Sequence, residues 1–88
     1  MYIVYILSSE SNNRWYIGMT ADIKVRLGEH NAGRVRSTKP YVPYRIIYTE
    51  TYPDKTTARK REIQIKKSGL IRKQLKDRIT NTALSSSG

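Results

Sequence analysis

The chain has 88 residues, enough for one small domain, and it contains no cysteine, which excludes disulfide bonds and metal sites built on cysteine. Its 17 Lys and Arg residues outnumber its seven Asp and Glu residues, which gives a net charge of +10. Such an excess favours a polyanionic partner, chiefly nucleic acid, over a lysine-rich surface that serves solubility alone. Residues 1–50 carry seven basic and four acidic groups, net +3, whereas residues 51–88 carry ten and three, net +7.

The first part of the chain is expected to form a β-hairpin. Residues 1–8 are an almost continuous apolar run rich in Tyr, Ile and Val, which is typical of a strand buried on both faces. The run is too short to span a bilayer and no basic segment precedes it, so we expect no signal peptide, no membrane helix and a cytoplasmic protein. Residues 10–13 have the composition of a turn, and residues 14–19 are predicted to form the second strand.

A helix, a loop and a third strand are predicted next. Thr20 or Asp22 can cap the helix, and Gly33 is expected to end it. Residues 34–43 are basic and contain two prolines, so we expect an exposed loop. Residues 44–52 are rich in Tyr, Ile and Thr and predict the third strand.

The C-terminal part is expected to be helical and then disordered. Asp54 or Thr56 can cap a helix over residues 55–67, and a shorter helix is predicted over residues 70–79. Residues 80–88 are polar and Ser-rich, so we expect a disordered tail.

The predicted order of elements is therefore β-β-α-β-α-α. Three strands with helices packed against them indicate an α/β (α+β) fold, with a small three-stranded antiparallel sheet flanked by helices. Residues 1–79 would form the single domain.

Two tyrosines on the predicted hairpin, Tyr5 and Tyr16, are candidate site residues. A buried tyrosine usually packs its ring and hydrogen-bonds its hydroxyl, which is the structural interpretation. In the functional interpretation, both tyrosine hydroxyls point into a cleft, where one of them deprotonates or orients a water for attack on phosphorus. A tyrosine pKa near 10 makes it a poor base at neutral pH unless a nearby cation or metal lowers that value.

Arg26 and His30 are separated by one helical turn and so share a face of the predicted helix. An arginine offers a planar fork for a phosphate and for the charge that builds on it during displacement, although many arginines are simply exposed. His30 is the only histidine, and it could be structural, or it could hydrogen-bond a phosphate or transfer a proton.

Glu62 is the remaining candidate, because it falls on the same helix face as Ala58 and Ile65, which should point inward. A buried carboxylate is rare unless it is paired or bound to a metal. A pair with Arg59 or Arg61 is the structural interpretation. The alternative is a divalent metal ligand, since Mg²⁺ often uses only one or two protein carboxylates.

These residues together resemble the GIY-YIG nuclease family. The tripeptide of residues 3–5 is followed by Tyr16-Ile17-Gly18, by Arg26 and His30, and by Glu62, in order and over most of the chain. No single piece is specific, and the first Gly of the name motif is an Ile here. Within the family, the chain is most similar to the short stand-alone members of the UPF0213 type.

The resemblance implies a metal-dependent endonuclease that hydrolyses phosphodiester bonds in DNA, or in RNA, with a role in DNA repair or recombination. The implied catalytic residues are Tyr5, Tyr16, Arg26, His30 and Glu62, and Glu62 would hold one Mg²⁺ or Mn²⁺. We expect a monomer or weak dimer with DNA, more than RNA, as its partner. The alternative function is a non-catalytic nucleic-acid-binding module on the same scaffold.

The basic groups outside this set are candidate phosphate contacts, which would give salt-dependent affinity without sequence preference. Those expected to bind nucleic acid are Arg34, Arg36, Lys39, Arg45, Lys66 and Lys67, with Arg72, Lys73 and Lys76 as further candidates. The aromatic side chains of Trp15, Tyr41 and Tyr44 could stack on bases or pack in the core.

Overall fold

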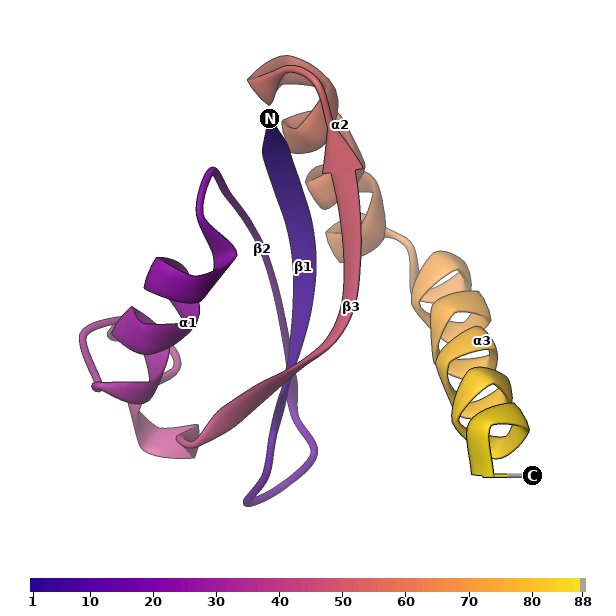
Figure 1. Cartoon of the computed structure of the whole chain (residues 1–88), viewed down its shortest axis with the longest axis horizontal. Coiled ribbons are helices and arrows are strands. Elements are labelled where there is room, and N and C mark those ends of the chain that lie inside the picture. Colours follow the sequence, from indigo (N-terminus) through magenta and orange to yellow (C-terminus); the bar gives the residue numbers. More distant parts are fainter. Residues whose placement is uncertain (88) are drawn as a thin grey trace.

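The computed structural model describes the backbone of residues 1–87 and the side chains of residues 1–79. The order β-β-α-β-α-α and the three-stranded antiparallel sheet are as predicted (Figure 1). The elements are β1 (Tyr2–Ser9), β2 (Trp15–Thr20), α1 (Ile23–Asn31), a short 3-10 helix (Lys39–Tyr41), β3 (Tyr44–Tyr52), α2 (Lys55–Lys67) and α3 (Gly69–Ser87).

Strand β1 is the centre of the sheet, whose order is β2-β1-β3. It runs antiparallel to both neighbours, so that Tyr5 lies opposite Gly18 of β2 on one side and Thr49 of β3 on the other. A β-bulge in β3 shifts the register between Ile6 and Leu7. Because helices also cover both faces, every residue from position 4 to position 9 is buried, and the prediction of a doubly buried strand is confirmed.

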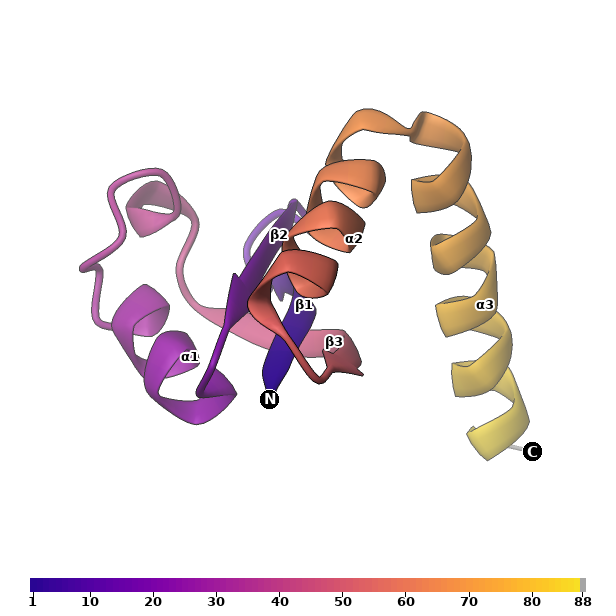
Figure 2. The ribbon, with the colours of Figure 1, turned by 90° about the horizontal axis from the view of Figure 1, so that it is seen from above.

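The helices form two layers, one on each side of the sheet. Helix α1 lies on one face, and α2 and α3 lie on the other (Figures 1 and 2). The alternation of side chains along β1 divides the core accordingly, since Val4 and Ile6 pack toward α2 and α3 while Tyr5 and Leu7 pack toward α1.

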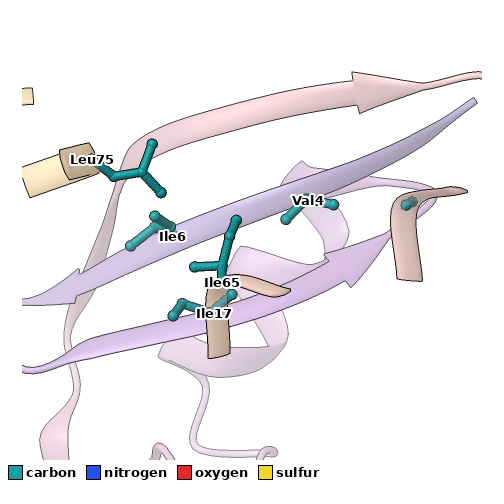
Figure 3. Close-up of a cluster of buried hydrophobic side chains, with 6 residues drawn as sticks. Val4, Ile6, Ile17, Ile65 and Leu75 are labelled. Atoms are coloured by element: carbon teal, nitrogen blue, oxygen red, sulfur yellow. The ribbon is translucent and has the colours of Figure 1, made fainter. Parts of the chain in front are cut away.

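The larger core lies on the α2 and α3 face. Ile65 of α2 packs over Ile6 and Ile17, and Leu75 of α3 reaches the same cluster beside Ile6 (Figure 3). Ile65 and Leu75 are 0% and 4% exposed, so each helix is attached to the sheet by a fully buried side chain. Burying such a side chain contributes on the order of 2 kcal/mol.

Both predicted helix caps are present. The carboxylate of Asp22 accepts hydrogen bonds from the backbone N–H groups of Lys24 and Val25 at 3.1 and 3.2 Å. The Asp54 carboxylate accepts from the Thr57 N–H at 2.8 Å. These bonds satisfy N–H groups that have no partner within the first turn of a helix. Gly33 follows α1 with a φ of +75°, a left-handed conformation in which glycine is favoured.

Two predicted segments differ from the structure. Helix α3 runs from Gly69 to Ser87, so it does not end near residue 79. The physical reason is that no Gly or Pro interrupts the helix after Gly69, and weak helix formers alone do not end it. Gly88 lies outside the described residues. The segment of residues 34–43 is not wholly exposed either, because Thr38 is 1% exposed. Within the described residues, no helix is both long and apolar enough to cross a membrane.

A polar network ties α2 to β3. The Glu50 carboxylate accepts hydrogen bonds from the hydroxyls of Tyr48 and Tyr52 at 2.5 and 2.7 Å, and two from Arg61 of α2 at 2.8 and 3.0 Å. Burial alone would raise the pKa of Glu50, but the bonds from Arg61, Tyr48 and Tyr52 outweigh it and lower the pKa to about 2. The ionised carboxylate therefore stabilises the contact between the helix and the sheet.

We predict that Glu50→Gln lowers the free energy of unfolding at pH 7, and that the loss shrinks as the pH falls. The folded-state pKa lies below the ordinary value of 4.5, so the contribution is full above pH 4.5 and is lost as the pH falls toward 2. The shift corresponds to on the order of 3 kcal/mol. Urea unfolding between pH 2 and 7 measures the difference. Glu10→Gln removes the same charge from an exposed side chain and should change little. If the free energy of unfolding depended on pH in the same way for wild type and Glu50→Gln, the role of the network would be contradicted.

Candidate active site

The Tyr5 hydroxyl lies at the centre of the candidate site, on the α1 face of the sheet. Tyr5 is 1% exposed, and its ring extends across the neighbouring strand over Gly18. A Cβ added at Gly18 would lie 2.4 Å from the Tyr5 hydroxyl oxygen. Any side chain in β2 at this position would therefore displace the hydroxyl, which explains why a glycine is found there.

Helix α1 presents Arg26 and His30 to this hydroxyl. The Nε of Arg26 donates to the Tyr5 oxygen at 3.4 Å, and Nε2 of His30 lies 3.1 Å from the same oxygen. The two side chains share a helix face, as the i, i+4 spacing predicts. His30 is 0% exposed, so it belongs to the interior of the domain.

Thr38 fixes the other side of the histidine ring. Its hydroxyl lies 2.8 Å from Nδ1 of His30 and donates to the carbonyl of Val35 at 3.2 Å. When the single Thr38 hydroxyl proton is on the Val35 carbonyl, Thr38 accepts from an N–H at Nδ1 of His30. In a neutral ring Nε2 then carries no proton, and it accepts the hydrogen bond of the Tyr5 hydroxyl. No local pattern in the sequence indicates this contact.

The environment keeps both members of the Tyr5–His30 pair neutral at neutral pH. Burial, followed by the charge of Arg26, lowers the pKa of His30 below its ordinary value. Burial raises the pKa of Tyr5, and the hydrogen bond from Arg26 opposes it. The proton therefore rests on Tyr5, with an unprotonated nitrogen at hydrogen-bonding distance to receive it.

Tyr16 completes the aromatic part of the cluster. Its ring centroid lies 6.3 Å from that of Tyr5 and 4.7 Å from that of His30, in an edge-to-face arrangement with the histidine. The two tyrosines thus face the same side of the sheet. Tyr16 is only partly buried, and among the described side chains its hydroxyl has no hydrogen-bond partner.

Glu62 is the candidate residue on α2, the helix on the other face of the sheet from α1. Its side chain is 15% exposed, while Ala58 and Ile65 on the same helix face are fully buried, so it lies inward as predicted. The negative charge of Glu62 contributes to the raised pKa of Tyr5, after burial and the influence of Tyr16. The alternative of a pair with Arg59 or Arg61 does not occur, because Glu62 pairs with Lys66 and Arg61 binds Glu50.

The partner of Glu62 is Lys66, whose Nζ lies 3.3 Å from Oε2 one turn along the helix. The other carboxylate oxygen has no partner among the described residues. These residues hold no cluster of three or more His, Cys, Asp or Glu. A single carboxylate of this kind fits a Mg²⁺ or Mn²⁺ ion that takes its remaining ligands from water and phosphate oxygens.

Arg26 also forms an ion pair that the sequence analysis did not foresee. Its Nη1 lies 3.4 Å from Oε1 of Glu29, at the i, i+3 spacing that often joins opposite charges on a helix. The two side chains are 34% and 40% exposed, so the pair is weak and can open. The guanidinium is thus held by Nε on Tyr5 and by Nη1 on Glu29.

The residues predicted to bind nucleic acid are all exposed but do not form one patch. Arg34, Arg36 and Lys39 lie in the segment between α1 and β3, Lys66 and Lys67 lie at the end of α2, and Arg45 lies in β3. Of the aromatic candidates for stacking, Tyr44 is buried and packs with Tyr5. The Arg14 guanidinium covers the Tyr41 ring at 4.5 Å. Trp15 is half-buried on the opposite face of the sheet from Tyr16.

Comparison with known proteins agrees with this arrangement. Residues 1–74 match the family model described as the GIY-YIG catalytic domain. A UPF0213 protein from Halobacterium salinarum is 33% identical over 75 residues, which cover 84% of this chain and 96% of the relative. A UPF0213 protein from Staphylococcus haemolyticus is 35% identical over 66 residues, covering 74% and 79%.

A solved structure shares the fold. The solution NMR structure of a UPF0213 protein from Bacillus halodurans aligns with a TM-score of 0.54 and 31% identity, over 88% of this chain and 84% of that one. The relatives are short, single-domain proteins, and the family model spans most of the chain. The chain belongs to the GIY-YIG catalytic domain family, and its relatives are UPF0213 proteins.

Proposed function

We propose that this protein is a metal-dependent endonuclease that hydrolyses phosphodiester bonds in DNA, or in RNA, and that it acts in DNA repair or recombination. The observation that carries the proposal is the Tyr5 hydroxyl, held between Arg26 and His30 against Gly18. Tyr16 lies over the histidine, and the charge of Glu62 is close enough to affect Tyr5. Family membership and the charge of +10 support a nucleic-acid substrate.

Arg26 is the residue that would hold the scissile phosphate. Its Nε is fixed by Tyr5, and its outer nitrogens can exchange the weak pair with Glu29 for two hydrogen bonds to phosphate oxygens. A guanidinium fixed in this way would also stabilise the charge that develops on the phosphoryl oxygens during in-line attack.

The two tyrosines would have different tasks. Tyr16 is partly exposed and can orient the attacking water, whereas Tyr5 is buried and already donates to His30. Hydrolysis joins the water oxygen to phosphorus, breaks the bond to the leaving oxygen and releases a proton from the water. Nε2 of His30 would accept that proton, with the Tyr5 hydroxyl as the relay between them.

Glu62 would hold one Mg²⁺ or Mn²⁺, as GIY-YIG nucleases typically use a divalent metal. When bound, the ion would polarise the phosphoryl oxygens and stabilise the leaving oxygen. Lys66 would have to release Oε2 or share it, which is feasible because the Lys66 side chain is 49% exposed and i, i+4 helix pairs contribute only about 0.3–0.5 kcal/mol.

The same ion pair favours the alternative function, a nucleic-acid-binding module that does not cut. With Lys66 on Glu62 and Glu29 on Arg26, both charged groups of the site are engaged within the protein. A module of this kind would bind DNA through its basic surface, and the binding would weaken with salt. Cleavage that depends on Glu62 distinguishes the two functions.

We predict that Glu62→Ala reduces cleavage at least 100-fold, because no other acidic side chain takes its place as a metal ligand. The measurement is a cleavage assay on labelled single-stranded, duplex and branched DNA and on RNA, with Mg²⁺ or Mn²⁺. Glu10→Ala is the matched control, since it removes an exposed carboxylate at the hairpin turn. Equal cutting by wild type and Glu62→Ala would refute the assigned role. Binding without cutting of any probe would identify the binding module.

We predict that Thr38→Val reduces cleavage about tenfold or more, whereas Thr38→Ser retains most of it. Valine has nearly the same shape but cannot accept the N–H at Nδ1, so the tautomer that leaves Nε2 free for Tyr5 loses its support. The unsatisfied buried donor should also lower the free energy of unfolding by about 1–3 kcal/mol. The pH dependence of the cleavage rate separates the two effects.

A purely structural role for Thr38 would lower stability and leave the pH–rate profile in place. A shifted profile in Thr38→Val, restored in Thr38→Ser, would support proton transfer through His30. An unchanged profile, with cleavage reduced only as far as the folded fraction, would contradict it.

A further inference from the structure

The face of the sheet opposite Tyr5 carries a second basic feature, at the hairpin end of the domain. Two adjoining hollows, of about 450 and 320 Å³, lie between the β1–β2 hairpin and α3. Both are lined by Asn13, Trp15 and Lys76, so they form one continuous depression, which we call the α3 hollow. Helix α3 contributes Lys73 and Lys76 to its lining, and Figure 2 shows α3 on the side of the sheet away from α1.

The register of the sheet creates this hollow. Ser8 in the central strand lies opposite Trp15 of β2 on one side and Arg45 of β3 on the other. A small side chain therefore separates two large ones in the same row. The bulge in β3 contributes, because its extra residue places Arg45 on the same face as Ser8.

The lining of the α3 hollow is positively charged. Lys73 and Lys76 of α3 and Arg45 of β3 line it and are exposed, and none has a carboxylate partner among the described residues. Arg72 also lines it, but it is engaged in donating to the carbonyls of Ile65 and Lys66 at the end of α2. No Asp or Glu lines either hollow, so an anion entering it meets charge of one sign.

Trp15 gives the hollow a flat apolar wall among these cations. Its ring is partly buried against the core on one side and borders both hollows. An aromatic surface beside backbone-binding cations is the combination that holds single-stranded nucleic acid, because each unpaired base offers a face for stacking. A duplex offers no such face in its interior.

We propose that the α3 hollow binds a single-stranded segment of nucleic acid, with a base stacked on Trp15 and phosphates on Lys73, Lys76 and Arg45. This inference rests on the nucleic-acid part of the proposed function and names the form of the substrate. Trp15 and Tyr16 are adjacent in β2, an edge strand, and point to opposite faces. A strand held on Trp15 thus reaches the Tyr5 site by passing around one edge strand.

Trp15 is the only tryptophan, so its fluorescence reports on the hollow directly. We expect saturable quenching when the protein is titrated with a 12-nucleotide oligodeoxythymidylate in EDTA, and much less with a matched duplex. Lys73→Gln/Lys76→Gln should weaken single-strand binding at least tenfold. It should also make the dependence of log K on log salt shallower by about 1.4, which corresponds to two lost phosphate contacts.

The matched control is Lys55→Gln/Lys60→Gln, which removes the same charge from the start of α2, away from the hollow. Equal weakening by both double variants would show an effect of net charge alone and overturn the proposal. Equal quenching by duplex and single strand would overturn the stacking on Trp15. Quenching by an acidic polypeptide but by no oligonucleotide would assign the hollow to a protein partner instead.

The tryptophan itself is tested with a fluorescein-labelled oligonucleotide and anisotropy. Trp15→Ala should weaken binding roughly 10- to 100-fold, and Trp15→Phe should stay within a few-fold of wild type because it keeps an aromatic face. Circular dichroism checks that each variant folds. If Trp15→Ala is unfolded, the comparison of Trp15→Phe with Trp15→Leu decides the question, and equal affinity of these two would contradict stacking.

Failure of this inference is distinguishable from failure of the proposed function. Binding in EDTA that depends on Lys73 and Lys76, with no cutting of any probe, would support the hollow and refute the nuclease. Cleavage dependent on Glu62, with single-strand affinity unchanged in Lys73→Gln/Lys76→Gln, would support the nuclease and overturn the hollow.

Discussion

Strand β1 is enclosed on all four sides, and this constraint organises the rest of the molecule. It pairs with β2 and β3 at its edges, and helices cover both of its faces. A polar side chain on such a strand needs a hydrogen-bond partner within the protein, because an unpaired buried group is costly. The Tyr5 hydroxyl therefore has to be satisfied by whatever lies beside it, and α1 supplies Arg26 and His30. His30 is buried in turn, and Thr38 satisfies it.

The hydrogen bonds that link Tyr5, His30 and Thr38 have a chemical consequence. The hydrogen bonds are linked: in the tautomer in which Thr38 donates to the Val35 carbonyl, His30 donates from Nδ1 to Thr38 and accepts at Nε2 from Tyr5. Burial also holds His30 and Tyr5 neutral by shifting their pKa values in opposite directions. The same contacts that stabilise the interior thus leave a proton donor and an empty acceptor in contact. Such an arrangement serves a structural role unaided, and it becomes catalytic only beside groups that bind phosphate, which is why Arg26 and Glu62 decide the function.

Much of this structure could be predicted from the sequence. The parts that could not be predicted were missed for physical reasons. The apolar run of β1, the capping residues Asp22 and Asp54, and the strand of residues 44–52 are encoded locally, and all are present. The shared face of Arg26 and His30 follows from helix geometry. The partner of Glu62 could not be chosen, because Arg59, Arg61 and Lys66 are all within reach along a helix. The contact of Thr38 with His30, and the bulge that places Arg45, depend on tertiary packing and register, which leave no local pattern.

The edge strand β2 has side chains on both faces of the domain. Its alternation places Tyr16 and Gly18 toward the Tyr5 site, and Trp15 and Ile17 toward α2 and α3. Since no further strand pairs with β2 in this sheet, its outer edge is the shortest route from one face to the other. The basic charge and the candidate site thus lie on different faces of the sheet. The excess after residue 50 lies largely on helices of the Trp15 face, while the chemistry lies mainly on the Tyr16 face. A substrate with an unpaired segment could contact both faces at once, whereas a continuous duplex could contact only one. In the proposed binding mode, the form of the substrate would be selected through the two sides of one strand.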